Sequence, residues 1–317
     1  MKERNKSIDI LKLILIALVV TVHLLPYKFD SQYQTNIAYI IHSLGRVVVP
    51  LFFIISGYFI KDKIENFNTI RKISFRFFKM FVVWQLIYSY IIYLLYSNNS
   101  LSNQQLYTGI IYGFGHLWYL NATFLGVFLV YFMNNLSITV KLFTAITLIL
   151  IGYTLQLSLE LKFLTSNVIA VYNIIGTSRN FLFFGFPYLL IGTIFDKISL
   201  QKVDQSLLFF LFCLIIEGFI YLYFKINVSN IYISAIPLSI FIFKYVLQSD
   251  KKIRINVNPK LLLGTYLIHF YAVFYLTIYY PKFSFGASII KILLALLITI
   301  PLFYLLNFLD KKIKLLF

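Results

Sequence analysis

Three ionisable side chains lie within the first apolar segment of the chain, where a charge is costly and therefore indicates a site. Asp9, Lys12 and His23 occur in IDILKLILIALVVTVH, and an ionisable group at the centre of a membrane helix costs about 2.5–3.5 kcal/mol. On a helix, Lys12 and His23 would differ by about 20° around the axis and about 16 Å along it, so they share a face. Asp9 is spaced to pair with Lys12. The alternative is that Lys12 only extends to the cytoplasm and His23 marks the outer interface.

The second apolar segment carries an arginine that is hard to explain as a surface residue. Arg46 opens RVVVPLFFIISGYFI, one turn after His42, and lies about 10 Å below the expected outer entry of the helix. We therefore expect it to be functional. Pro50 is predicted to kink this segment because it removes a helix hydrogen bond. Ser56 and Gly57 are small enough for a close approach by another helix, and for Ser56 helix packing is the favoured interpretation.

Four further ionisable side chains are candidates for a polar core. They are His116, Arg179, Glu217 and His269. For His269, a catalytic role and a buried structural hydrogen bond are equally open. Glu217 could instead be a structural partner of an arginine. The chain has one cysteine, no HExxH, no phosphate-binding glycine loop and no GxSxG motif, so we predict neither a metal site nor a soluble-enzyme active site.

The composition indicates a membrane protein. Hydrophobic residues make up 60% and charged residues 12% of the 317 residues, whereas soluble domains carry about 25% charged residues. We predict an all-α, polytopic bundle of about ten transmembrane helices, forming a single integral membrane domain over 1–317. The expected spans are 8–27, 38–60, 74–96, 115–134, 138–157, 180–196, 205–225, 229–247, 260–280 and 286–309. The segment 163–176, before the sixth span, is also apolar and is open to interpretation as a re-entrant or interfacial piece.

Basic residues alternate from loop to loop and set the orientation. They gather before the first span, in the second loop, after the eighth span and in the tail, at Lys2, Arg4, Lys6, Lys61, Lys63, Arg71, Lys72, Arg76, Lys79, Lys251, Lys252, Arg254, Lys260, Lys311, Lys312 and Lys314. The loops between them are poor in charge, so both termini are predicted to be cytoplasmic. These clusters account for the net charge of +17 without a nucleic-acid partner. The first span lacks a small-residue cleavage site and is expected to be retained.

Five motifs give the chain a likeness to a known family. In chain order they are IDILKLILIALVVTVH, RVVVPLFFIISGYFI, GHLWYLNATF, SRNFLFFGFPYLLIG and LLGTYLIHFYAVF. The chain resembles the acyltransferase family 3 membrane proteins over essentially its whole length. By the motif match, His23 corresponds to the essential histidine of that family and Arg46 to the arginine before its PLFF motif. Lys12 stands where the family usually has arginine, which keeps the charge but loses bidentate phosphate binding.

The resemblance implies transfer of an acyl group, often acetyl, from cytoplasmic acyl-coenzyme A to a carbohydrate outside the cell or on a lipid carrier. Acyl-coenzyme A is the expected donor substrate and a glycan the acceptor, with membrane lipid around the protein, no bound cofactor and the plasma membrane as location. His23 would act as general base, or carry the acyl group itself. Arg46 would stabilise the oxyanion, and Lys12 with Asp9 would serve donor binding.

Some members of that family carry an added extracellular hydrolase-like domain. This sequence contains none, so either the membrane part alone or a separate protein is expected to complete the transfer. The main competing hypothesis is a transporter or flippase of a small polar solute or glycan without acyl chemistry. A structural or sensory protein would leave His23, Arg46 and Glu217 at membrane depth unexplained.

Overall fold

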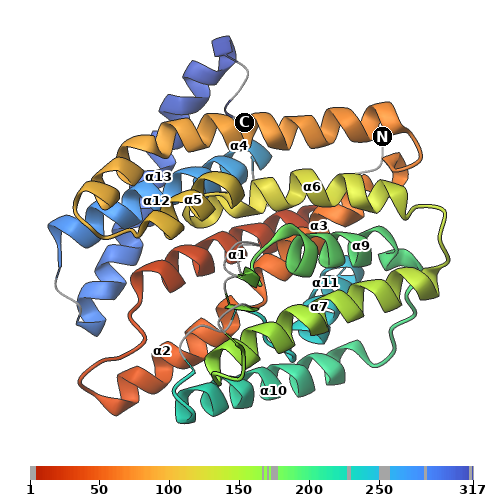
Figure 1. The fold of residues 1–317 in the computed structure, drawn as a ribbon, viewed down its shortest axis with the longest axis horizontal. Coiled ribbons are helices and arrows are strands. Elements are labelled where there is room, and N and C mark those ends of the chain that lie inside the picture. Colours follow the sequence, from red (N-terminus) through yellow and green to blue (C-terminus); the bar gives the residue numbers. More distant parts are fainter. Residues whose placement is uncertain are drawn as a thin grey trace. The chain divides into compact units, whose positions relative to one another are not determined.

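The structure is a computed structural model, and the regular elements in the part of the chain that it describes are all helices (Figure 1). Within that part no strand occurs. The described residues are 5–165, 168–169, 171–172, 178–226, 230–249, 258–281, 284–313 and 316. The basic residues Lys2, Arg4, Lys251, Lys252, Arg254 and Lys314, and part of the apolar piece 163–176, lie outside them.

The helices confirm a polytopic membrane bundle. Among the described residues, eight helices are long and apolar enough to cross a membrane. They are Lys6–Leu24, Gln32–Lys63, Phe67–Ser97, Gly115–Phe132, Ile138–Glu160, Val203–Tyr223, Pro259–Tyr279 and Phe285–Lys311. The sixth and eighth expected spans correspond to shorter apolar helices, Phe181–Thr193 and Ala235–Gln248. At 1.5 Å per residue each of these is about 20 Å long, which is less than the hydrocarbon core of about 30 Å.

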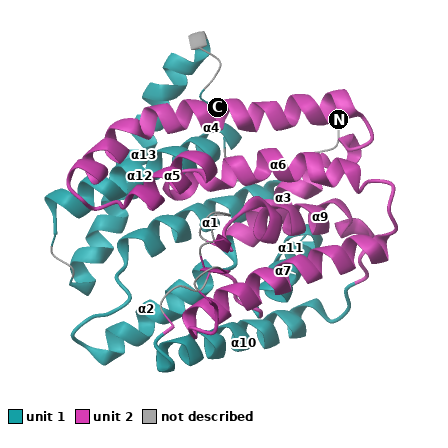
Figure 2. Cartoon of the chain, in the orientation of Figure 1, with its two compact units in different colours: residues 1–48, 200–225, 234–317 teal, residues 49–199, 226–233 magenta. Residues whose placement is uncertain are grey.

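The chain forms two compact units, and unit 1 consists of residues 1–48, 200–225 and 234–317 (Figure 2). Its helices are α1 (Lys6–Leu24), α2 (Gln32–Gly45), α10 (Val203–Tyr223), α11 (Ala235–Gln248), α12 (Pro259–Tyr279) and α13 (Phe285–Ile313). Helix α1 packs against α2, α11, α12 and α13. The helix that carries Lys12 and His23 is therefore in contact with most of its unit.

Unit 2 consists of residues 49–199 and 226–233 (Figure 2). Its helices are α3 (Val48–Ile60), α4 (Phe67–Ser97), α5 (Asn103–Tyr112), α6 (Trp118–Phe132), α7 (Ile138–Glu160), a π-helical turn (Phe181–Gly185) and α9 (Phe186–Thr193). Helix α6 packs against α4, α5, α9 and the π-helical turn. Glycines bring α3 and α9 together, since a Cβ on Gly57 would overlap the Leu189 carbonyl of α9. This confirms the packing expected of Gly57.

The expected single helix over 38–60 is interrupted, and the interruption precedes the proline. Helix α2 ends at Gly45, Arg46 and Val47 form a turn, and α3 begins at Val48. Pro50 is thus in the first turn of α3, where backbone N–H groups have no partner within the helix. In a continuous helix its ring would clash with the Arg46 carbonyl four residues before it. The membrane-length span Gln32–Lys63 therefore contains two helices, α2 and α3, with Arg46 in the turn between them, rather than one helix kinked at Pro50.

A short helix lies in the segment expected to be a loop after the third span. Helix α5 begins with a capping box in which the Ser102 hydroxyl accepts from the Gln105 N–H (3.2 Å) and the Gln105 side chain accepts from the Ser102 N–H (2.9 Å). The box satisfies N–H groups that a helix start otherwise leaves open. The Ser-x-x-Gln spacing was the sequence signal for this helix. It was missed because the segment has no long apolar run.

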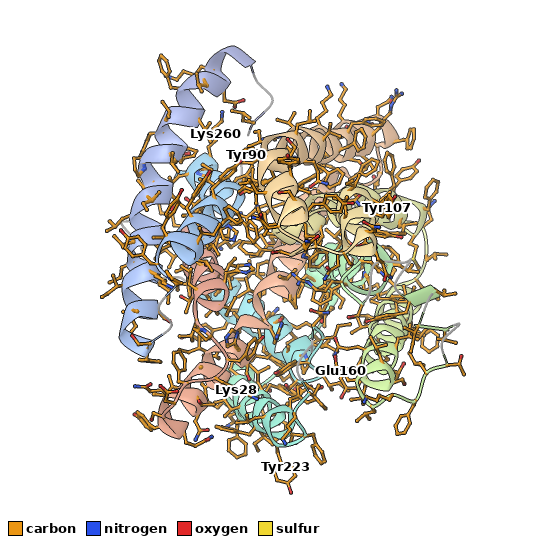
Figure 3. The ribbon with its side chains drawn as sticks, turned by 60° about the vertical axis from the view of Figure 1, so that its left-hand side comes forward. Lys28, Tyr90, Tyr107, Glu160, Tyr223 and Lys260 are labelled. Carbon is orange, nitrogen blue, oxygen red and sulfur yellow. The ribbon has the colours of Figure 1, made fainter. Side chains whose placement is uncertain are left out.

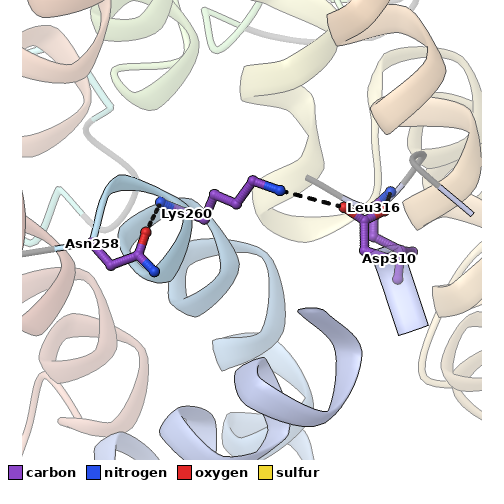
Figure 4. Close-up of polar contacts among 4 residues, drawn as sticks. All are labelled: Asn258, Lys260, Asp310 and Leu316. Carbon is purple, nitrogen blue, oxygen red and sulfur yellow. Dashed lines mark hydrogen bonds and ion pairs between the residues drawn. The ribbon is translucent and has the colours of Figure 1, made fainter. Parts of the chain in front are cut away.

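Polar contacts tie the start of α12 to the end of α13 in unit 1 (Figure 4). Asn258 caps α12 by accepting from the Lys260 N–H (3.0 Å). The Lys260 ammonium lies 4.0 Å from Oδ2 of Asp310, and Oδ1 of the same carboxylate accepts from the Leu316 N–H (2.7 Å). A half-exposed ion pair of this kind contributes about 1 kcal/mol at most.

Large apolar and aromatic side chains cover the outer sides of the helices. Tyr90, Tyr107 and Tyr223 are each more than half exposed, at 59%, 66% and 81%, and Figure 3 shows Tyr223 projecting outward at the end of α10. Isoleucine, leucine and phenylalanine side chains on α7, α10 and α13 are exposed in the same way. Surfaces of this composition are expected where lipid rather than water surrounds the helices.

Candidate functional site

His23 lies in the last turn of α1 and its side chain is exposed. The helix begins at an Asn5 cap, whose side chain accepts from the Ser7 and Ile8 N–H groups, and it ends with Leu25 in an extended conformation. The apolar run between these ends keeps the segment helical in a membrane. The His23 imidazole therefore lies at the end of a helix whose buried side chains are almost all apolar.

A second histidine of unit 1 lies beside His23. The ring centroids of His23 and His269 are 5.5 Å apart with an interplanar angle of 34°, and Phe270 meets His23 edge to face at 6.0 Å. His269 is fully buried, and its Nδ1–H donates to the Tyr266 carbonyl at 2.5 Å. Because a carbonyl only accepts, the neutral His269 ring carries its lone pair on Nε2. The contact joins two candidates that the sequence had treated separately.

An apolar cluster holds this histidine pair in place. Val20 and Leu24 of α1 flank His23 along the chain and pack with residues that follow His269 on α12 and with one residue of α13, namely Ala272, Val273, Leu276 and Ala295. All six side chains are at least 93% buried. Close packing of this kind fixes rotamers and backbone positions. The separation of the two imidazoles is therefore set by the core of unit 1.

Arg46 belongs to a second polar group next to the end of α1. Its Nη2 donates to the Tyr27 hydroxyl (2.7 Å), and the Tyr27 ring stacks on His42 with centroids 3.7 Å apart at 13°. His42, which is buried, donates from Nε2 to the Leu25 carbonyl (2.9 Å). Two side chains of the α2 segment thus fix the residues directly after His23. Sequence reasoning assigned no role to Tyr27, which is one of 25 tyrosines, or to His42, whose partner, the Leu25 carbonyl, is 17 residues away in the sequence.

Lys12 and Asp9 lie on α1, near its other end. Asp9 is in the first turn and only 7% exposed, and Lys12, three residues on, is half-buried. The structure thus places the expected donor-binding residues and His23 on one helix of unit 1. The pairing of Asp9 with Lys12 and their part in donor binding stay predictions.

Glu217 of α10 caps another helix. Its Oε2 accepts from both the N–H (2.9 Å) and the hydroxyl of Ser234, the N-cap residue of α11, and its Oε1 accepts from the Tyr221 hydroxyl (3.0 Å). A carboxylate at a helix N-terminus satisfies open N–H groups and interacts favourably with the helix dipole. These contacts give Glu217 a structural task in joining α10 to α11.

The other two candidates belong to unit 2. His116 is buried in the short turn Gly115–Leu117 before α6, with its ring 5.4 Å from that of Tyr88. Arg179 is exposed, and its guanidinium carbon lies 5.3 Å from the Trp118 ring, which is within cation–π range. The predicted polar core is therefore distributed over both units. Among the described residues, no group of three or more histidine, cysteine or acidic side chains is placed to hold a metal ion.

Comparison with curated proteins finds distant relatives that are longer than this chain. The chain is 23% identical over 297 residues to an amino-acid racemase of Enterococcus faecalis, a match that covers 85% of this chain and 41% of the relative. It is 29% identical over 233 residues to a serine/alanine racemase of Enterococcus gallinarum, covering 67% of this chain and 32% of the relative. The chain thus spans less than half the length of either relative. No solved structure matches the chain significantly.

The family comparison covers almost the whole chain. The acyltransferase domain that defines acyltransferase family 3 matches residues 5–308. That range contains every candidate side chain described above, from Asp9 to His269, together with all eight membrane-length helices except the last residues of α13. The chain therefore belongs to acyltransferase family 3 as a multi-pass membrane protein.

Proposed function

We propose that this protein is a membrane O-acyltransferase of the plasma membrane that moves an acyl group, acetyl in the first instance, from cytoplasmic acyl-coenzyme A to an extracytoplasmic carbohydrate. The observation that carries the proposal is the exposed imidazole of His23 beside the buried imidazole of His269, at the end of the helix that also bears Lys12. The family match supports acyl transfer as the reaction class. The racemase names describe relatives of which this chain matches only a minor part.

The reaction needs a base, an oxyanion partner and a hold on the donor. His23 removes the proton from a sugar hydroxyl as its oxygen bonds to the thioester carbonyl carbon. The carbon–sulfur bond then breaks, and the coenzyme A thiolate takes a proton and leaves as the thiol. Alternatively, His23 bonds to the acyl carbon first while the carbon–sulfur bond breaks and coenzyme A leaves; the sugar hydroxyl then takes the acyl group as its bond to His23 breaks. We favour the general base.

Two cations suit the other tasks. Arg46 stabilises the negative oxygen of the tetrahedral intermediate, and its bond to Tyr27 aims it beside the end of α1. Lys12 contacts donor phosphate at the cytoplasmic end of α1. His269 is a positioning residue, because its backbone hydrogen bond fixes the ring that lies against His23.

The test is release of coenzyme A from acetyl-coenzyme A by the purified full-length chain in nanodiscs. A thiol reagent would detect the product, so the assay uses a Cys213→Ser background, which removes the one free thiol of the chain. Radiolabelled acetyl-coenzyme A is supplied with a bacterial envelope polysaccharide as acceptor. We expect thiol release together with label in the polysaccharide. Movement of solute across proteoliposomes with no thiol release would replace the proposal by the transporter hypothesis.

A further inference from the structure

Unit 2 contains a pocket whose lining includes none of the side chains assigned to the reaction. Its volume is about 590 Å³, and it is lined by α5, by the loop that follows α5, by Trp118 at the start of α6 and by Arg179. Small-molecule sites typically measure about 300–1,000 Å³. By the predicted topology, both the segment that contains α5 and the segment that contains Arg179 are on the outer side of the membrane, where a glycan acceptor would be.

The wall formed by the loop after α5 has a fixed shape. Gly113 has φ +116° and Gly115 φ +56°, conformations that favour glycine. A Cβ on Gly113 would overlap the Trp118 backbone nitrogen and would lie 2.7 Å from the Leu117 carbonyl carbon. The missing side chain is what lets the loop lie directly against the start of α6.

Two amide side chains brace this loop from neighbouring helices. Gln85 of α4 donates to the Gly109 carbonyl (2.9 Å) and accepts from the Phe114 N–H (3.1 Å). Asn121 of α6 donates to the carbonyls of Ile111 (2.9 Å) and Tyr112 (3.3 Å). The end of α5 and its loop are therefore held without a ligand. A preformed site lowers the ordering cost of binding.

Arg179 lines the pocket, and hydrogen bonds hold the residues on either side of it in place. The Ser178 hydroxyl donates to the buried Gln156 side chain (3.2 Å), and Asn180 caps the π-helical turn by accepting from the Leu182 and Phe183 N–H groups. Ser178 and Asn180 are 0% and 4% exposed, whereas Arg179 between them is exposed. The backbone on both sides of the guanidinium is thus fixed, and the Trp118 ring supports it.

The lining has the chemistry of a site for a hydroxyl-rich anion. Gln104, Ser102, Thr108 and Tyr112 offer amide and hydroxyl groups that both donate and accept, and Arg179 adds a positive charge. None of the described lining residues is acidic. We propose that this pocket binds the acceptor and that the acceptor unit is an acidic sugar, with Arg179 contacting its carboxylate or phosphate. The inference rests on the proposed function and names the substrate class.

The same lining argues against a free amino acid as the ligand. The ammonium group of an amino acid would need an acidic partner or an aromatic cage. No acidic side chain occurs in the described lining, and the Trp118 ring is already in contact with Arg179. An amino acid would therefore match the pocket at its carboxylate alone.

Binding can be measured without any catalysis. The full chain in nanodiscs is titrated with glucuronate, glucose 6-phosphate, glucose and L-serine by saturation-transfer NMR. We expect one or both charged sugars to bind at least about ten-fold more tightly than glucose, because one hydrogen bond to a charged group increases affinity by about that factor. The two charged arms identify whether carboxylate or phosphate is recognised. Equal binding of charged and neutral sugars, or preference for L-serine, would overturn the proposal.

Three variants locate the site. Arg179→Gln should remove the preference for charged sugars and leave glucose binding unchanged, whereas Gln104→Ala should weaken all the sugars similarly. Lys162→Gln is the matched control, because Lys162 is an exposed cation on the same predicted side of the membrane and does not line the pocket. An unchanged preference in folded Arg179→Gln, or an equal loss in Lys162→Gln, would reject the site. Sugar binding without coenzyme A release would instead reject the proposed reaction alone.

Discussion

The histidine pair of unit 1 and the pocket of unit 2 are built by different means. The first consists of side chains on packed helices, with His23 and His269 fixed by the apolar cluster around them. The second lies where helices end, and Gln85, Asn121 and Gln156 hold backbone groups that helices leave open. Helix packing suits a reacting group whose position must not vary. Braced loops suit recognition, because they present many polar groups to one ligand.

The largest effect is expected from the reacting group. His23→Gln should lower kcat by about 100-fold or more, since a general base contributes roughly 10²–10⁴ in rate, while sugar binding in unit 2 stays normal. Thiol release and NMR binding on the same preparation measure the two. Thr21→Val is the control, because the Thr21 hydroxyl in the same turn donates to the Ala17 carbonyl of its own helix (2.9 Å). Normal turnover of His23→Gln would remove His23 from the mechanism.

A smaller effect is expected at the donor end of α1. Lys12→Gln should raise the acetyl-coenzyme A KM with little change in kcat, because it removes binding shared by ground and transition states. One charge-assisted contact corresponds to about 1.5–3 kcal/mol, or roughly 10–150-fold in kcat/KM. Lys12→Arg should be tolerated or improve donor binding, since guanidinium keeps the charge. If KM is unchanged in Lys12→Gln, Lys12 makes no phosphate contact.

The features that sequence predicted well are those with a high cost in lipid. Apolar runs located every helix of membrane length because backbone groups in lipid must bond within the segment. The same cost singled out His23, Arg46 and His269 as unusual residues. Lys12 and His23 both lie on α1, as the first apolar run predicts. What it could not give was the neighbour of each residue, such as the approach of His269 from α12.

The features that sequence missed depend on ordinary polar residues. Gln85, Asn121 and Gln156 are common types, and each acquires a role only from partners distant in sequence, such as Ile231 for Gln156. The break at Arg46 was missed because hydropathy continues through it. Glu217 was expected in a polar core and caps α11, which depends on where Ser234 lies in space. Long-range pairing is not encoded in local composition.

The braced loop should respond to loss of its brace. Gln85→Leu removes the bonds to Gly109 and Phe114 and leaves a backbone N–H without that partner, at a cost of about 1–2 kcal/mol. We expect sugar binding about 5–30-fold weaker, with the donor KM unchanged. Gln85→Glu, which keeps the acceptor for Phe114, should lose less. A change in donor KM with intact sugar binding would contradict the assignment of the pocket to the acceptor.

The smallest effect is expected from loss of the hydrogen bond between Arg46 and the Tyr27 hydroxyl. Tyr27→Phe removes the hydroxyl that accepts from Arg46 and keeps the ring that stacks on His42. One hydrogen bond contributes about 1 kcal/mol, so kcat should fall roughly five-fold, while both KM values and the thermal midpoint in detergent stay near those of the native chain. Tyr39→Phe is the matched control, since Tyr39 meets the Tyr27 ring at 5.6 Å and lies on the same helix as His42.

If Arg46 stabilises the oxyanion, Arg46→Lys should lower kcat more than Tyr27→Phe does, because an ammonium cannot reproduce the planar guanidinium geometry. If Arg46 only fastens the end of α1, both variants should lower the thermal midpoint together and leave the turnover of folded protein unchanged. The ratio of turnover loss to stability loss therefore decides whether the Arg46 group takes part in the chemistry of unit 1 or only supports its frame.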